Sequence, residues 1–182
     1  CKRPPVHIAP AGEQPQFEAM PWFYAPLLLT SYIHPVTRNV AEVKADFSSS
    51  IDLVGENEKL DAYLLLATST NTHILRTTAT IDLSDFPSMS DTEYFNAYNV
   101  PVAVSLEGVF PSVFTNRFVP PGVVESRPFK NESVGTRQIV VADGDIIRND
   151  ISGEDIVPLG YDRFMDQQFG NKDFIQNAVL YL

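Results

Sequence analysis

The sequence predicts a β-rich α/β fold built on a mixed sheet, with α+β as the alternative. About six segments show the short apolar or alternating pattern of strands, whereas only the C-terminal segment has the period of a helix. The strand, loop and helix predicted over 139–182 follow one another as they do in α/β units. We therefore expect residues 1–182 to form a single domain.

The composition is that of a folded chain without a membrane span of its own. Hydrophobic residues make up 44% and charged residues 20% of the chain, which is enough apolar material for a core. The richest apolar runs, 62–67 and 100–106, are much shorter than the roughly 18 residues that a membrane helix needs. The formal net charge of −10 would repel a phosphate backbone, so nucleic acid is not an expected partner.

The first 26 residues are rich in proline and aromatic side chains, which predicts an extended segment without helix. Cys1 is the only cysteine, so a disulfide framework and a multi-cysteine metal site are both excluded. Its position leaves two interpretations, a lipid-modified N-terminus that anchors the chain to a membrane and an arbitrary first residue. We favour the second because no signal sequence precedes Cys1.

Four strands are predicted before residue 110. Residues 44–54 alternate like a strand buried on one face, while 62–69 are apolar on both faces, as in a central strand. The β-branched content of 73–83 favours a further strand, and 100–106 alternate again. The polar residues 84–99 are expected to form a loop.

The second half of the chain ends in the single predicted helix. Prolines make 110–135 a long surface excursion, and 139–142 read as a short buried strand. In the helix, Asn171 is predicted to be the N-cap and Asp173 to favour the dipole from the first turn. One apolar stripe is expected to face the core, formed by Phe174, Ile175, Ala178, Val179 and Leu182. Because the chain ends inside this helix, we expect the working protein to continue.

Catalytic and cofactor motifs are not found. The chain has no Gly-x-Ser-x-Gly elbow and no phosphate-binding glycine loop. His7, His34 and His73 lie far apart without the spacing of metal ligands, and we expect ordinary, partly exposed histidines. An amidotransferase-like enzyme would need a cysteine nucleophile, and the proline-rich surroundings of Cys1 do not suit one. We therefore expect no enzyme, no metal and no cofactor.

The most site-like feature is Asp143-Gly144-Asp145, which follows a predicted strand. Paired carboxylates at the end of a strand could hold Mg²⁺ or Ca²⁺, but a tight turn capped by the aspartates is the simpler interpretation. The candidate ligand-binding residues at this strand-to-helix edge are Asp143, Asp145, Asn149, Asn171 and Asp173.

Aromatic residues suggest a second possibility. Exposed rings could stack against a sugar or another small solute, or they could simply cover the core or an edge of the fold, as most aromatic side chains do. We favour cover. The residues concerned are Trp22, Phe23, Tyr24 and Tyr161.

Several blocks over residues 13–182 resemble the gliding-motility ABC-transporter auxiliary family of Bacteroidetes, the GldG family. The VADGD and FGNKDF blocks are the most specific, since they also resemble the wider family of ABC-transporter auxiliary domains. The blocks occur in the family's order: EQPQFEAMPWFYAPLLLTS, HPVTRNV, VKADFSSSIDLV, PVAVSLEGVF, IVVADGDIIRN, PLGYDRF and FGNKDFIQNAVLYL.

This resemblance implies a non-catalytic extracytoplasmic module at the periplasmic face of the inner membrane. Its partners would be the permease and the cytoplasmic ATPase of one ABC-transporter-like complex, and its membrane anchors would lie outside these residues. The implied fold is Rossmann-like or glutamine-amidotransferase-like, with this chain forming part of a longer domain. The resemblance brings no catalytic residues with it. A solute- or carbohydrate-binding domain is the alternative, and an amidotransferase-like enzyme comes after it.

Overall fold

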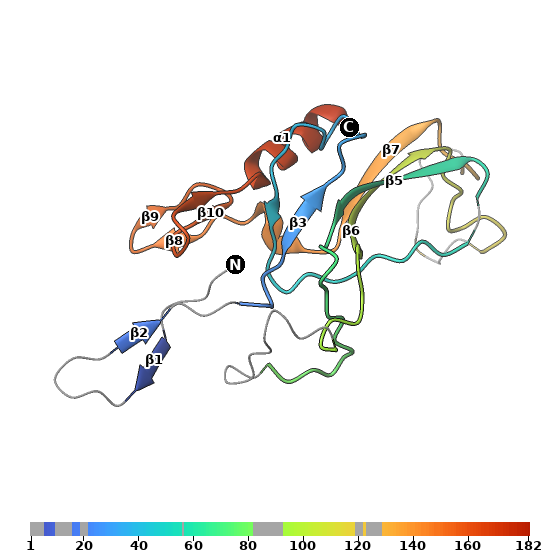
Figure 1. The fold of residues 1–182 in the computed structure, drawn as a ribbon. Coiled ribbons are helices and arrows are strands. Elements are labelled where there is room, and N and C mark those ends of the chain that lie inside the picture. The colour runs from blue at the N-terminus through green and yellow to red at the C-terminus, as the bar shows by residue number, and fades with distance from the viewer. Residues whose placement is uncertain are drawn as a thin grey trace.

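The fold is organised around a five-stranded antiparallel sheet (Figure 1). A computed structural model describes residues 6–9, 16–18, 22–55, 57–81, 93–118, 122 and 129–182. In order across the sheet, the strands are β4 (Val43–Lys44), β3 (Leu27–Thr30), β5 (Leu60–Ala67), β6 (Pro101–Gly108) and β7 (Thr136–Val141). Together with one α-helix among the described residues, this sheet confirms the predicted β-rich α/β class.

The remaining elements are short. A 3-10 helix, η1 (Gly144–Ile147), follows β7, and the helix α1 (Asn171–Tyr181) closes the chain. In Figure 1, β8, β9 and β10 extend to one side of α1, away from β5 and β7. None of the helices in the described ranges has the length and hydropathy needed to cross a bilayer. Three further antiparallel pairs are formed by β1 (Val6–Ala9) with β2 (Gln16–Glu18), β8 (Ile151–Ser152) with β9 (Asp155–Ile156), and β10 (Tyr161–Asp162) with β11 (Gln167–Gln168).

The two longest strands form the middle of the sheet. β5 lies at the centre, paired with β3 and β6, and its last three residues are buried. β6 is buried over Val102–Ser105. β5, β6 and β7 confirm the strands predicted at 62–69, 100–106 and 139–142. The burial predicted for 139–142 is wrong, because β7 is an edge strand whose residues are exposed or only partly buried.

Helix α1 packs on the sheet through one narrow stripe. Asn171, Phe174 and Ala178 are its buried residues, spaced three and four apart along one face. Ile175 and Tyr181 pack partly against the same core. Val179 and Leu182, which were predicted to face the core, are 70% and 66% exposed. That part of the prediction is wrong, because Val179 lies about 100° around the helix from Ala178 and Leu182 lies beyond Tyr181, the last helical residue.

Two predicted strands are not formed as such. After Lys44 the chain leaves the sheet, and Phe47 has a φ of 53°, which no strand residue adopts. The backbone N–H groups of the segment after Lys44 bond to different neighbours. Ser49 donates to the carbonyl of Ala142, and Ile51 donates to the carbonyl of Pro101. The alternation over 44–54 thus reflects a segment that crosses the ends of strands. The described part of 73–83, up to residue 81, is irregular.

Gly170 fixes how closely the helix approaches the strands. Its N–H donates to the carbonyl of Glu42 at 2.9 Å, and its carbonyl accepts from Phe174. A Cβ at this position would lie 2.4 Å from the carbonyl oxygen of Ala41, a backbone atom that cannot rotate away. The glycine of the FGNKDF block is therefore a packing requirement.

We predict that Gly170→Ala destabilises the fold by about 1–3 kcal/mol, the usual cost of overpacking, in urea denaturation followed by circular dichroism. Gly144→Ala is the matched control, because nothing lies within 4 Å of the added Cβ there. The control should stay within about 1 kcal/mol of the parent chain. Equal effects of the two substitutions would contradict this account of Gly170.

Candidate functional site

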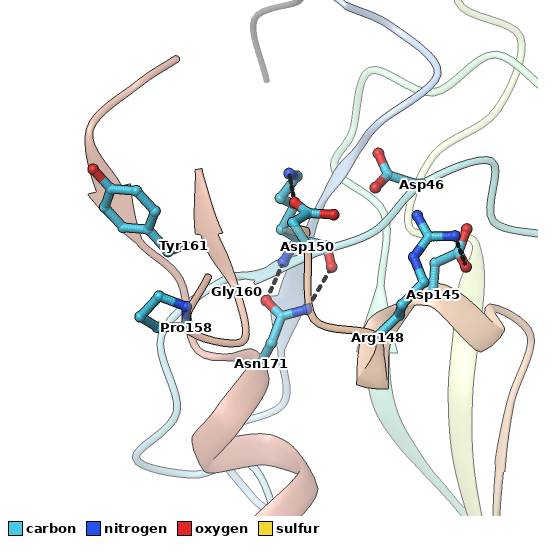
Figure 2. Close-up of a pocket in the computed structure, with 9 residues that line it drawn as sticks. Asp46, Asp145, Arg148, Asp150, Pro158, Gly160, Tyr161 and Asn171 are labelled. Atoms are coloured by element: carbon cyan, nitrogen blue, oxygen red, sulfur yellow. Dashed lines mark hydrogen bonds and ion pairs between the residues drawn. The ribbon is translucent and has the colours of Figure 1, made fainter. Parts of the chain in front are cut away.

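A small polar pocket lies where β4, η1, β10 and the start of α1 meet (Figure 2). Five of its lining residues are charged. The residues that line it are Lys44, Asp46, Asp145, Arg148, Asp150, Pro158, Gly160, Tyr161 and Asn171.

The side chain of Asn171 joins three segments, α1, β4 and η1, at the base of this pocket. Its side chain is 3% exposed. Oδ1 accepts from the Lys44 N–H at 2.9 Å, while Nδ2 donates to the carbonyls of Lys44 at 2.8 Å and Ile146 at 3.2 Å, as Figure 2 shows in part. The predicted N-cap role is wrong. Gly170 occupies that position without a side-chain bond, and the amide of Asn171 bonds to buried backbone instead.

Gly160 provides the space for Asn171. It has a φ of 81°, and a Cβ there would lie 2.8 Å from both Cβ and Oδ1 of Asn171. A side chain at residue 160 would therefore be strained and would also displace the amide.

Lys44, which lines the pocket, forms two ion pairs. Its Nζ lies 3.4 Å from Oδ2 of Asp162 and 3.9 Å from Oδ2 of Asp150. Asp162 is 2% exposed, and its Oδ1 accepts the N–H groups of Phe164 and Met165. Both oxygens of this buried carboxylate are thus satisfied, as a charge removed from water requires.

The Asp143-Gly144-Asp145 segment has the geometry of a capped turn. Oδ1 of Asp143 accepts from the N–H of Asp145 at 2.8 Å and so caps η1, while Oδ2 accepts from the N–H of Asp46 at 2.9 Å. Asp145 pairs with Arg148 at 2.8 Å. No three Asp, Glu, His or Cys side chains in the described ranges are grouped as metal ligands would be. The Asp143 carboxylate thus caps the turn, and that of Asp145 forms an ion pair.

Asp46 is the carboxylate of the pocket with the most altered acidity. Partial burial raises its pKa, and the charges of Asp150, Asp143 and Asp145 raise it further, against the lowering effect of Lys44. This carboxylate therefore holds a proton more readily than an exposed aspartate.

The five candidate residues divide between the pocket and its surroundings. Asp145 and Asn171 line the pocket, and Asp143 adjoins it through Asp46. Asn149 donates instead to the carbonyl of Val157 at 2.8 Å, and Asp173 is exposed on the first turn of α1.

The sequence interpretation missed four charged members of the pocket. Arg148 and Asp150 continue the polar run after the DGD block, a signal that was available. Lys44 and Asp46 gave no such signal, since they lie about a hundred residues earlier in the chain.

The four aromatic candidates do not form one stacking surface. Trp22 and Tyr24 have ring centroids 5.0 Å apart and cluster with Phe47. Phe23 lies instead against two other rings, those of Tyr94 and Phe95, at 6.0 and 6.4 Å. On β10, the hydroxyl of Tyr161 donates to Asp166 at 2.6 Å.

A second polar cluster, which the sequence did not predict, is centred on Glu107 of β6. Its Oε1 accepts from the Tyr181 hydroxyl at 2.7 Å and lies 3.3 Å from both Nε2 of His34 and Oγ of Ser105. Its Oε2 lies 3.4 Å from Nε of Arg137. This cluster, which we call the Glu107 cluster, joins β6, β7, the loop after β3 and the end of α1.

Arg137 and His34 enclose the end of α1. Arg137 donates to the carbonyl of Tyr181 at 3.2 Å and stacks over its ring at 4.5 Å. His34 contacts the same ring edge-on at 4.9 Å and is 5% exposed. The prediction of a partly exposed histidine is wrong for His34, because the helix covers it. His73 is partly exposed, and the side chain of His7 lies outside the described residues.

The Glu107 cluster does not have the arrangement of a nucleophile and its base. Ser105 and His34 both bond to the carboxylate of Glu107, whereas a serine nucleophile would bond to the histidine. Burial raises the pKa of Glu107, but the hydrogen bonds from Tyr181, His34 and Ser105 outweigh it, so the pKa lies below its ordinary value. The hydrogen bond between Tyr181 and Glu107 also raises the pKa of Tyr181 above its ordinary value.

We predict that Asn171→Ala lowers the free energy of unfolding by about 2–4 kcal/mol, because it leaves buried backbone groups of Lys44 and Ile146 without partners. Chemical denaturation would measure the loss. Asp173→Ala, two residues further on and exposed, should cost only about 0.3–1 kcal/mol. A loss at Asn171 no larger than at Asp173 would show that the amide bonds do not hold these segments.

We predict that the Glu107 cluster makes the fold sensitive to acid. Since the pKa of Glu107 is lowered in the folded chain, its contribution to stability is complete above the ordinary value of 4.5 and is lost as the pH falls through the lower folded-state value. Denaturation at a series of pH values should show stability falling in this range. Glu107→Gln should reduce that dependence, whereas the exposed Glu154→Gln should retain it. Identical pH profiles for the two variants would contradict this role of Glu107.

Comparison with known proteins places these features in a family. A family model described as an ABC-type uncharacterized transport system matches residues 1–178. No curated protein and no solved structure gave a significant match. The matched region contains the whole five-stranded sheet, the pocket and most of α1. The chain therefore belongs to the family of auxiliary proteins of ABC-type transport systems.

Proposed function

We propose that this chain is a non-catalytic, extracytoplasmic interaction module of an ABC-transport complex of the gliding-motility type. The observation behind this proposal is the family match over residues 1–178. Transport systems of this class combine a permease with an ATPase, and both are the proposed partners. Membrane segments outside these residues would hold the module at the periplasmic face of the inner membrane.

The chemistry of the two polar clusters supports a module that binds rather than reacts. Asn171 bonds to backbone, and Asp162 pairs with Lys44 while it holds a turn. In the Glu107 cluster, both oxygens of the carboxylate are engaged by neighbouring side chains. Side chains used in this way fix the surface of the fold, which is what an interaction module requires.

Large apolar side chains on the surface are consistent with partner contacts. On the exposed side of α1, Val179 and Leu180 are 70% and 86% exposed, and Ile151 and Ile156 of the β8–β9 pair are 71% and 75% exposed. Exposed apolar groups of this size mark interaction surfaces when they gather in patches.

We predict that affinity purification of the tagged full-length protein from its native bacterium, solubilised in mild detergent, recovers an ABC permease and its ATPase. Double substitution of Val179 and Leu180 with serine should weaken recovery while preserving the fold, because neither side chain is buried. Thr136→Ser, an exposed position on β7, is the matched control. Recovery of neither subunit would overturn the proposed partnership.

Location is tested separately, by adding protease to intact spheroplasts. We expect this chain to be cleaved while the ATPase is protected, because the module is proposed to lie outside the cytoplasmic membrane. Protection of both proteins until the cells are lysed would overturn the extracytoplasmic placement.

A further inference from the structure

The hairpin formed by β8 and β9 stands clear of the core. Every residue from 147 to 156 is exposed. In Figure 1 the pair extends to one side of α1, away from β5 and β7. Among the described residues, its two strands form a sheet of their own. A two-stranded hairpin of this kind is only marginally stable by itself in water, so a partner that packs on it would stabilise it.

Local bonds fix the shape of this hairpin. Gly153 has a φ of 65° and takes the first position of the two-residue turn, where glycine is favoured. At the open end, the N–H of Val157 donates to the carbonyl of Asp150 at 2.9 Å, and Nδ2 of Asn149 donates to the carbonyl of Val157 at 2.8 Å. Asn149, one of the candidate ligand residues, thus extends the hairpin. A surface fixed in this way loses little freedom when a partner binds to it.

Ile151 and Ile156 form one apolar face of the hairpin, which we call the isoleucine face. The two residues are directly opposite each other in the register, so their side chains lie on the same face, and they are 71% and 75% exposed. Ser152 and Asp155, the next pair, lie on the other face, which is polar. The isoleucine face is therefore apolar surface that is open to a partner.

The charge around the isoleucine face selects among the possible occupants. Glu154 lies in the turn and Asp155 follows it, and neither forms an ion pair with a described residue. Arg148, the nearest basic residue in sequence, is already paired with Asp145 at 2.8 Å. A second copy of this chain, with its net charge of −10, and a surface of anionic lipid would both be repelled. A protein segment with lysine or arginine beside its apolar side chains is attracted instead.

We propose that the isoleucine face docks onto an extracytoplasmic segment of the permease that carries lysine or arginine beside apolar side chains. The apolar side chains of that segment cover Ile151 and Ile156, and its cations pair with Glu154 and Asp155. This inference rests on the proposed function, because a module outside the cytoplasmic membrane can reach the permease but not the ATPase.

Photo-crosslinking in intact cells tests this contact directly. The full-length protein carries the photoreactive p-benzoylphenylalanine in place of Ile156 or, as the control, of Val134, which is 74% exposed just before β7. We expect only the first probe to label a permease peptide, and that peptide to contain lysine or arginine. No adduct from the first probe, equal labelling of the permease by both, or a labelled peptide without basic residues would each overturn the proposal. So would an adduct with lipid, with the ATPase or with a second copy.

Removal of the isoleucine face tests its apolar part. The double variant Ile151→Ser and Ile156→Ser should lower recovery of the permease about tenfold in affinity purification of the full-length protein, because the two side chains form the centre of the contact. Circular dichroism should be unchanged, since both residues are exposed. If this variant does not fold, the crosslink from the parent sequence decides the question. Undiminished recovery by the folded variant would overturn the contact.

Reversal of the local charge tests the choice of a basic partner. The double variant Glu154→Lys and Asp155→Lys should also lower permease recovery about tenfold, by placing cations against cations. The control is Asp52→Lys and Glu58→Lys, which changes the net charge equally at exposed positions outside the hairpin and should leave recovery unchanged. Equal recovery by the two double variants would overturn the basic partner.

The two proposals fail in different ways. If the parent chain recovers the permease and the ATPase but the hairpin variants recover them equally well, the docking of the isoleucine face is overturned and the proposed function stands. If the parent chain recovers neither subunit, the proposed function is overturned and this inference with it.

Discussion

The attachment of α1 to the sheet is the constraint on which the rest of the fold depends. At its N-terminal end, Asn171 bonds to the backbone of β4 and of η1, two segments that come from distant parts of the chain. Phe174 then fills the core between them. Gly170 and Gly160 provide the close approach that these contacts need. The helix therefore determines how the ends of the sheet and the C-terminal loops are arranged.

The opposite end of the helix is held by a different kind of interaction. There the bonds of Tyr181 to the Glu107 cluster replace apolar burial, and the neighbouring Val179 and Leu180 remain exposed. Polar bonds of this kind depend on the protonation of their members, whereas the burial of Phe174 does not. The helix is thus held by buried contacts in its first half and by the bonds of Tyr181 in its last turn.

The proposed role in a transport complex agrees with this division. Asp46 and Glu107, two carboxylates whose pKa is shifted, lie in two clusters whose polar groups mostly bond to one another. Perturbed groups in a cleft are often catalytic, but ion-pair networks that only stabilise a fold perturb acidity as well. The geometry of Asn171, Asp162 and Glu107 is of the second kind. Under the proposed function, a stable surface with exposed apolar residues is the functional feature of this member of an ABC-type transport-system family.

Residues whose neighbours in space are also their neighbours in sequence could be assigned from the sequence alone. The apolar runs that form β5 and β6, the period of α1 and the capped turn at Asp143 are all local patterns, set by burial every second or every third to fourth residue. The family resemblance of the FGNKDF block could also be recognised from the sequence. Only the tertiary structure decided what the polar residues do, because their partners are far away in the chain. Asn171 bonds to Lys44, 127 residues away, and His34 to Glu107, 73 residues away. The antiparallel direction of the sheet and the irregular path after Lys44 were decided in the same way, since no local pattern encodes which strand end a segment will meet.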